Sequence, residues 1–334
     1  MFAPAVAAAI LVVLAGVLAV FSARAGAGYL PGLNVRQPAL ARLTPTRNAP
    51  PARASRRVIV VIIDGLRLSD SFGTPYLTSL RRAGIDAAAR SHFPTISRAN
   101  YVSIVTGVPP VASGVRSNTY HWPVDLDSLM ARARDAGLAS AFVGDYSPGL
   151  AFMFPDDFTD LYYTPWPGGF ERAATAVIDR DYPLVVLLPG KVDAMGHRFG
   201  ADSREYRDAV RFVDDQLAHA LAGVDLSRDT IIVCADHGHT DSGGHGGTED
   251  EVMEVPLIMA GAGIRAGAAI GPAQLIDIAP TAAALLGISA PGHGLGRPLT
   301  EALAASAATR SALDHAGTLR AARNNALLSE IATS

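Results

Sequence analysis

The sequence contains a single cysteine, Cys234, among its 334 residues, so no intrachain disulfide can form. Cys234 lies in the apolar run 230–235, where we expect a small buried core side chain rather than a reactive thiol. The scarcity of cysteine therefore excludes a fold held together by disulfides. Lysine is equally scarce, with Lys191 alone, although the overall composition of 49% hydrophobic and 18% charged residues is that of a globular protein.

Acidic residues are missing from one stretch of the chain. Residues 24–57 carry seven Arg and no Asp or Glu, while the net charge of the whole chain is −3. Without those seven positive charges the remainder has a net charge of about −10. An acidic body argues against a nucleic-acid-binding surface and fits an enzyme whose carboxylates hold cations.

The N-terminal residues 2–23 are uncharged and apolar, which approaches the ~20 residues needed to span a bilayer. We interpret this stretch as a transmembrane anchor, with a cleaved signal peptide as the alternative, because small-residue cleavage sites follow at 23–25 and 25–27. Residues 24–56 are rich in Pro, Ala and Arg without periodicity, which predicts a flexible linker.

From Arg57 onward, short apolar runs alternate with helical patterns. The runs 58–63, 139–143, 184–188, 230–235 and 256–260 predict strands, and the patterns at 75–83, 97–106, 126–136, 203–222 and 276–286 predict helices. The uninterrupted β-branched run 58–63 indicates a strand that is buried on both faces. We therefore expect an α/β catalytic domain over residues 57–300, a sheet with helices on both faces, and a C-terminal helical segment over 301–334.

Side chains that bind metals follow three of these predicted strands. They are three aspartates and three histidines: Asp64, Asp193, His197, Asp236, His237 and His245. Ligands of such sheets lie at the carboxyl ends of the strands, so we expect these six side chains at one edge. Alone, an Asp-Gly after a strand is a common turn, and the glycine-rich loop 243–247 reads as a flexible loop. Together the six suit two divalent ions, zinc first, with Mn²⁺ or Mg²⁺ as alternatives.

The motifs around these residues resemble the alkaline phosphatase superfamily from about Arg57 to about Leu299, especially its type I phosphodiesterase/nucleotide pyrophosphatase branch. Four segments carry the resemblance: Val61-Ile-Ile-Asp-Gly65, Phe93-Pro-Thr-Ile-Ser-Arg-Ala-Asn100, Asp193-Ala-Met-Gly-His197 and Asp236-His-Gly-His-Thr-Asp-Ser-Gly-Gly-His245. The Ser97-Arg98 pair and the His245 loop are more similar to glycolipid phosphoethanolamine transferases. Sulfatases of the superfamily use a Cys-x-Pro-Ser-Arg motif, which does not surround Ser97.

The resemblance implies an alkaline phosphatase-like fold with a central, mostly parallel sheet. It makes Ser97 the nucleophile, with Thr95 as the rival assignment, and places Asn118 against a nonbridging phosphoryl oxygen. It also implies two ligand sets, one formed by Asp64, Ser97, Asp236 and His237 and the other by Asp193, His197 and His245. His239, in the same loop, either supports a ligand or has no role in the site.

We therefore expect a metal-dependent hydrolase that cleaves phosphoesters, above all phosphodiesters, through a phosphoserine on Ser97. Alternatives are a phosphoethanolamine-type transferase that acts on a membrane glycolipid, and a non-catalytic membrane-anchored binding protein that retains a metal site. The expected substrate is a small-molecule or lipid phosphoester. We expect a membrane-anchored or secreted protein with an extracytoplasmic catalytic domain, as in the enzymes it resembles, although the Arg-rich stretch favours the opposite orientation.

Overall fold

The computed structural model describes residues 14–19, 32–146, 149–165 and 167–333 of the chain. The anchor or signal interpretation of residues 2–23 therefore falls mostly outside the described residues. Within the described ranges, no helix combines the length and hydrophobicity needed to cross a membrane.

One eight-stranded sheet organises the molecule, with strand order β4-β3-β5-β1-β6-β7-β2-β8. The strands are β1 (Arg57–Ile62), β2 (Gly84–Arg90), β3 (Ser140–Asp145), β4 (Asp160–Thr164), β5 (Leu184–Leu188), β6 (Asp229–Cys234), β7 (Glu254–Gly261) and β8 (Ala273–Gln274). Neighbouring strands from β4 to β6 are all parallel, and β7 is antiparallel to both β6 and β2. This sheet confirms the expected mostly parallel α/β fold.

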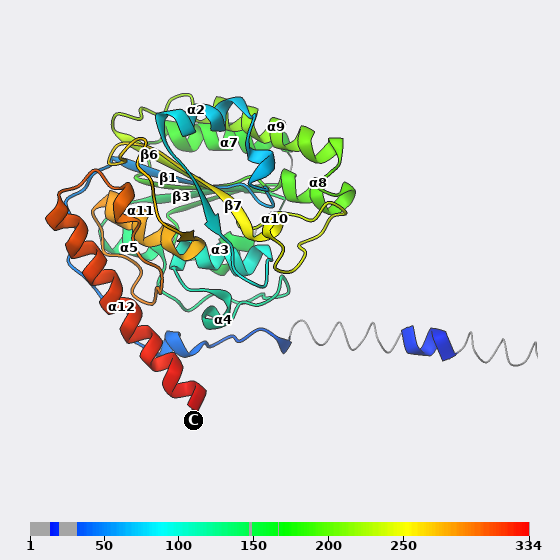
Figure 1. Ribbon diagram of the computed structural model, residues 1–334, viewed down its shortest axis with the longest axis horizontal. Coiled ribbons are helices and arrows are strands. Elements are labelled where there is room, and N and C mark those ends of the chain that lie inside the picture. The colour runs from blue at the N-terminus through cyan, green and yellow to red at the C-terminus, as the bar shows by residue number, and fades with distance from the viewer. Residues whose placement is uncertain (1–13, 20–31, 147–148, 166, 334) are drawn as a thin grey trace, which may run out of the picture.

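Helices cover both faces of the sheet (Figure 1). On one face lie α2 (Pro75–Ala83), α7 (Pro167–Asp179), α8 (Lys191–Phe199) and α9 (Arg204–Ala220). On the other lie α3 (Ser97–Thr106), α4 (Pro110–Ser113), α5 (Leu129–Asp135), α11 (Ile278–Leu286) and the long C-terminal α12 (Ala307–Thr333). The short helices α6 (Gly149–Met153) and α10 (Asp250–Met253) lie in the connections after β3 and before β7.

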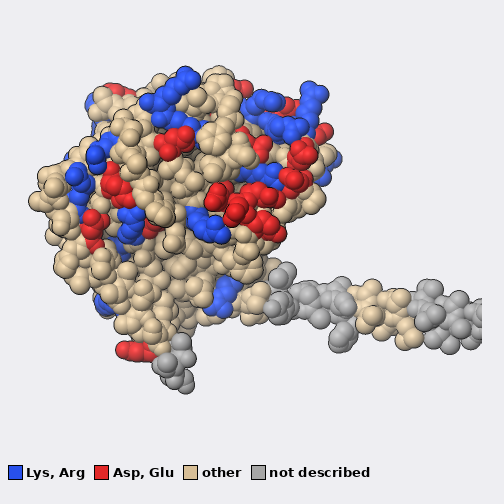
Figure 2. Space-filling model, viewed as in Figure 1, with Lys and Arg blue, Asp and Glu red and all other residues tan. Residues whose placement is uncertain are grey.

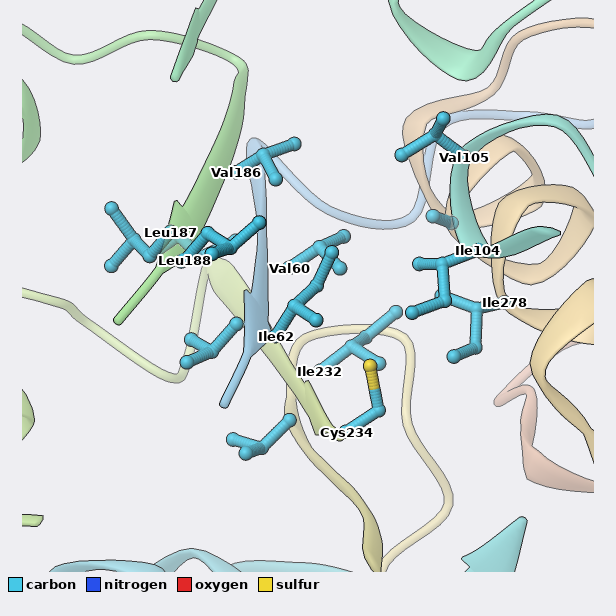
Figure 3. Close-up of a cluster of buried hydrophobic side chains, with 14 of the residues drawn as sticks. Val60, Ile62, Ile104, Val105, Val186, Leu187, Leu188, Ile232, Cys234 and Ile278 are labelled. Atoms are coloured by element: carbon cyan, nitrogen blue, oxygen red, sulfur yellow. The ribbon is translucent and has the colours of Figure 1, made fainter. Parts of the chain in front are cut away.

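The core lies where the central strands meet these helices. All six residues of β1 are buried, as expected for a parallel strand that is covered on both faces. Figure 3 shows Val60 and Ile62 of β1 beside Ile232 of β6, with Ile104 of α3 on the helical side. Cys234 is fully buried in this cluster, which confirms its role as a small core side chain.

Residues 32–56 differ from the predicted flexible linker, because they pack against the body. Leu40, in the 3₁₀ helix Ala39–Arg42, is fully buried. The backbone N–H of Val35 donates to the carbonyl of Gly114 at 2.8 Å, and the N–H of Ala54 donates to the carbonyl of Leu285 at 2.9 Å. The composition of this stretch predicted mobility, but its hydrogen-bond partners lie far along the chain and leave no local pattern.

Candidate metal centre

The strand order brings the predicted ligands together at one edge of the sheet. β1 lies between β5 and β6, and the three strands are parallel, so their carboxyl ends are adjacent. Asp64 follows β1, Asp193 lies in the first turn of α8 after β5, and Asp236 follows β6. β2 runs in the same direction as β6, because both are antiparallel to β7, and the loop after β2 leads to Ser97.

One group of potential ligands consists of Asp64, Asp236 and His237, all buried. His237 Nε2 lies 3.5 Å from Asp64 Oδ1, 3.3 Å from Asp236 Oδ2 and 3.3 Å from Ser97 Oγ. Ligand atoms that each lie about 2.0–2.2 Å from a tetrahedral ion are separated from one another by about 3.3 Å. The three oxygens around His237 Nε2 therefore lie at the separation from it that ligands of one ion would have.

The tautomer of His237 suits a ligand. Its Nδ1 lies 2.8 Å from the carbonyl oxygen of Gly238, which can only accept a hydrogen bond, so Nδ1 carries the proton. The lone pair of a neutral ring then lies on Nε2, the atom that faces the carboxylates. A backbone carbonyl that orients a histidine in this way is a common feature of metal sites.

Two carboxylate oxygens in this group have no hydrogen-bond partner among the described residues. They are Asp64 Oδ1 and Asp236 Oδ2, and both are the oxygens that face His237. Burial, followed by repulsion from the neighbouring carboxylates, holds the pKa of Asp64 well above its usual range, and burial also raises the pKa of Asp236. Buried, unpaired carboxylates are costly unless a cation binds them, so these residues fit a divalent ion.

A second group surrounds Asp193. Its Oδ1 lies 3.4 Å from His197 Nε2, and His197 Nε2 lies 3.0 Å from His245 Nε2. Burial lowers the pKa of the His245 ring to about 3, so this ring is neutral at physiological pH, as a ligand must be. Its Nδ1 has no partner among the described residues. The ligand atoms of Asp193, His197 and His239 lie close enough to hold an ion, and those of Asp193, His237 and His245 form another such group, so the proposed set of Asp193, His197 and His245 draws on both.

His239 also belongs to this group, and its place could not be decided from the sequence. Its Nε2 lies 2.9 Å from Asp193 Oδ1, while its Nδ1 contacts the carbonyl of Gly244 at 3.1 Å. Burial alone would raise the pKa of Asp193, but the hydrogen bond from His239 and the nearby histidine charges lower it to about 2. Gly65 makes this approach possible, since a Cβ at this position of φ +72° would lie 2.8 Å from His239 Nε2.

Ser97 opens α3, and its hydroxyl lies 3.3 Å from Nε2 of the candidate ligand His237. The hydroxyl of Thr95, the rival nucleophile, donates to the carbonyl of His245 at 2.9 Å. This bond holds the glycine-rich loop. The first free N–H groups of a helix, together with its dipole, favour an incoming phosphoryl group. This position supports Ser97 as the nucleophile.

Asn118 lies beside the start of the same helix. Its Oδ1 accepts a hydrogen bond from the backbone N–H of Arg98 at 3.0 Å, which leaves the amide nitrogen as the donor that a phosphoryl oxygen requires. The guanidinium of Arg98 donates to the carbonyl of Tyr120 and lies over the ring of Phe152, 4.7 Å from its centroid. These contacts give Arg98 a structural role.

Two further residues of the site were not predicted from the sequence. The hydroxyl of Tyr101, on α3, donates to Asp64 Oδ2 and leaves Oδ1 for a cation. Asp145, at the end of β3, accepts from the backbone N–H of Gly190 at 2.6 Å and so fixes the start of α8, which carries Asp193. The signal for Asp145 was present, because it ends a buried strand as Asp64 and Asp236 do.

A family model described as type I phosphodiesterase / nucleotide pyrophosphatase matches residues 58–148 and 112–254. Among curated proteins, the chain is 26% identical over 268 residues to the catalytic subunit of human GPI ethanolamine phosphate transferase 2. The match covers 72% of this chain and 27% of that protein. It is 24% identical over 281 residues to GPI ethanolamine phosphate transferase 2 of Aspergillus fumigatus, covering 72% of this chain and 36% of that protein. The chain thus spans only about a quarter to a third of the length of these relatives.

Solved structures share the fold at low sequence identity. The alkaline phosphatase PafA has a TM-score of 0.64 and 14% identity, covering 77% of this chain and 100% of the other. The 2-O GAG sulfatase BT1596 has a TM-score of 0.60 and 15% identity, covering 73% of each chain. These likenesses show the fold and leave the chemistry to be argued from the side chains.

Proposed function

Because the chain belongs to the type I phosphodiesterase / nucleotide pyrophosphatase family, we propose that it is a metal-dependent hydrolase that cleaves phosphodiesters with Ser97 as the nucleophile. The observation that carries this proposal is the position of the Ser97 hydroxyl. It lies at the N-terminus of α3 and 3.3 Å from His237 Nε2, beside two buried carboxylate oxygens that have no other partner among the described residues.

The proposed metal ligands divide as the two groups do. Asp64, Asp236, His237 and Ser97 would hold one ion, and Asp193, His197 and His245 the other, with His239 orienting Asp193. Bound divalent ions would lower the proton affinity of the Ser97 hydroxyl and neutralise phosphoryl charge, which is their usual contribution to such reactions.

The protein's own groups account for orientation in the proposed reaction. The N-terminus of α3 binds the phosphoryl group, and the Asn118 amide donates to a nonbridging oxygen as charge develops. Ser97 Oγ loses its proton and bonds to phosphorus while the bond to the leaving alcohol breaks. Water then attacks phosphorus, the bond to Oγ breaks, and Ser97 regains a proton.

The direct test uses the full-length protein, because residues 32–56 are packed on the body. Zinc-loaded protein should hydrolyse a p-nitrophenyl phosphodiester faster than the matching monoester or sulfate, and a chelator should abolish turnover. Ser97→Ala should lose nearly all turnover, whereas Ser103→Ala should not, because Ser103 Oγ only bonds the Ala99 carbonyl within the same helix. Full activity in Ser97→Ala, or a phosphoryl group trapped on Thr95, would refute the proposal.

A phosphoethanolamine-type transferase is the second candidate. It is supported by the similarity to the GPI ethanolamine phosphate transferases and by the Ser97-Arg98 pair. The two candidates share the first step and differ in the acceptor. If a glycolipid or simple alcohol acceptor receives the phosphoryl group faster than water does, the transferase is correct. If no ester is cleaved while metal still binds, a non-catalytic binding protein is the better interpretation.

A further inference from the structure

A cavity of about 580 Å³ lies beside the Ser97 loop. Its apolar wall consists of Leu33, Phe93, Pro94 and Ile96, and its polar side of Arg116, Ser117, Asn118 and Thr119. This volume is within the range of about 300–1,000 Å³ that is typical of small-molecule sites. Phe93 is 62% exposed, so this part of the apolar wall is open to solvent.

Two residues of the cavity wall, Ile96 and Asn118, are neighbours of the proposed nucleophile. Ile96 directly precedes Ser97 and occupies the N-cap of α3. Asn118, at the polar side, bonds the backbone N–H of Arg98, the residue after Ser97. These two residues place the cavity beside the start of α3, where Ser97 lies.

The N-terminal segment completes the wall, and several contacts hold it in place. Asn34 Oδ1 accepts from the backbone N–H of Arg116 at 2.9 Å, and Val35 bonds Gly114 through its backbone. Gly114 has φ +79°, and a Cβ there would lie 2.2 Å from the Val35 carbonyl oxygen, so only glycine permits this approach. Leu33 is thus fixed beside the cavity.

The surface around this segment is also different from the rest of the visible face. In Figure 2, red acidic atoms gather at the α8 and α10 end of the body, whereas the part beside the N-terminal segment shows mostly uncharged atoms. The charged side chain in the cavity lining is Arg116, whose guanidinium donates to the Val111 carbonyl at 2.9 Å and adds positive charge at this side. The other polar lining residues, Ser117 and Thr119, bond Asn34 and each other through their hydroxyls, so ribose hydroxyls and a polar base would compete with these bonds.

We propose that this cavity binds the apolar ester group of a phosphodiester, so that the enzyme prefers diesters with an alkyl chain. The inference rests on the proposed phosphodiesterase function and adds to it the substrate class and Phe93 and Leu33 as specificity-determining residues. Burial of each methylene changes a binding constant by roughly two- to fourfold.

The test is a series of p-nitrophenyl alkyl phosphates, from methyl to octyl, kept below their micelle-forming concentrations. In each reaction p-nitrophenolate leaves as Ser97 bonds to phosphorus, and water then releases the alkyl phosphate. The ratio of kcat/KM for octyl to kcat/KM for methyl should be large in the native protein and should fall at least tenfold in Phe93→Ala. Phe72→Ala is the matched control, because Phe72 is also exposed but lines a different surface. A native ratio near one would overturn the inference.

A binding measurement separates this inference from the proposed function. Calorimetry should show that n-octylphosphonate binds the zinc-loaded protein much more tightly than methylphosphonate, and that Phe93→Ala reduces the difference. Tight octylphosphonate binding without turnover of any ester would support the cavity assignment and refute the hydrolase. Turnover with equal affinity for both phosphonates would support the hydrolase and refute the cavity assignment.

Discussion

Replacing Asp145 with Asn tests how the sheet edge is built. Burial raises the pKa of Asp145 to about 6, although the Gly190 N–H and the charge of Lys191 lower it in part. An unfolded Asp has a pKa of about 3.9, so the folded state holds a proton that the unfolded state has lost over this interval. Stability therefore falls as pH rises from about 4 to 6, by about 3 kcal/mol for a shift of about two units.

Asp145→Asn removes this cost, because an amide cannot ionise and its oxygen can still accept from the Gly190 N–H. Near pH 8 the variant should be more stable than the native protein by up to about 3 kcal/mol, and near pH 4 the difference should shrink to about 0.5 kcal/mol. Urea unfolding of both proteins at the two pH values, under the same metal concentration, measures the difference. Equal stabilities at pH 8, or a less stable variant there, would contradict the assigned burial of an ionised carboxylate.

Three other substitutions test separate parts of the structure. His239→Ala should weaken zinc binding by roughly 10- to 100-fold without abolishing it, because a histidine that orients the proposed ligand Asp193 is lost. Competition with a fluorescent chelator measures this affinity. Asp214 accepts hydrogen bonds from two backbone N–H groups at the start of α2, at 2.8 and 2.9 Å. Asp214→Ala should therefore lower the free energy of unfolding, measured by urea titration, by about 2–4 kcal/mol. The control Asp215→Ala should change it little, because Asp215 is exposed. Gly114→Ala should make the N-terminal segment more accessible to limited proteolysis, and unchanged cleavage would show that the segment does not depend on this close approach.

The sequence predicted the central strands and the position of the aspartates that follow them, because each depends on a local pattern. The apolar runs of β1, β5 and β6 predicted strands, and the aspartates that follow them were assigned to one edge because parallel strands end together. β2 was not predicted, since Gly84-Ile-Asp-Ala-Ala-Ala-Arg90 contains few residues with strand preference and gains its place by pairing with β7.

Contacts between distant segments could not be predicted in the same way. Asn34 bonds a backbone N–H 82 positions later, and no feature of the Pro- and Arg-rich stretch marks that partner. The role of His239 likewise depends on a side chain 46 positions earlier, so its sequence position in the loop left both interpretations open. Such pairings depend on the assembled sheet rather than on local composition.

The order of the three central strands makes the proposed metal centre a late event in folding. Asp64, Asp193 and Asp236 approach one another only after β5 and β6 have paired in register on either side of β1, which closes loops of more than a hundred residues. A nascent chain that has not yet emerged past β6 lacks part of both ligand groups. Zinc would therefore bind tightly only to chains whose sheet is complete. By binding these chains, the ion would stabilise molecules with the correct strand register, in addition to its proposed catalytic role.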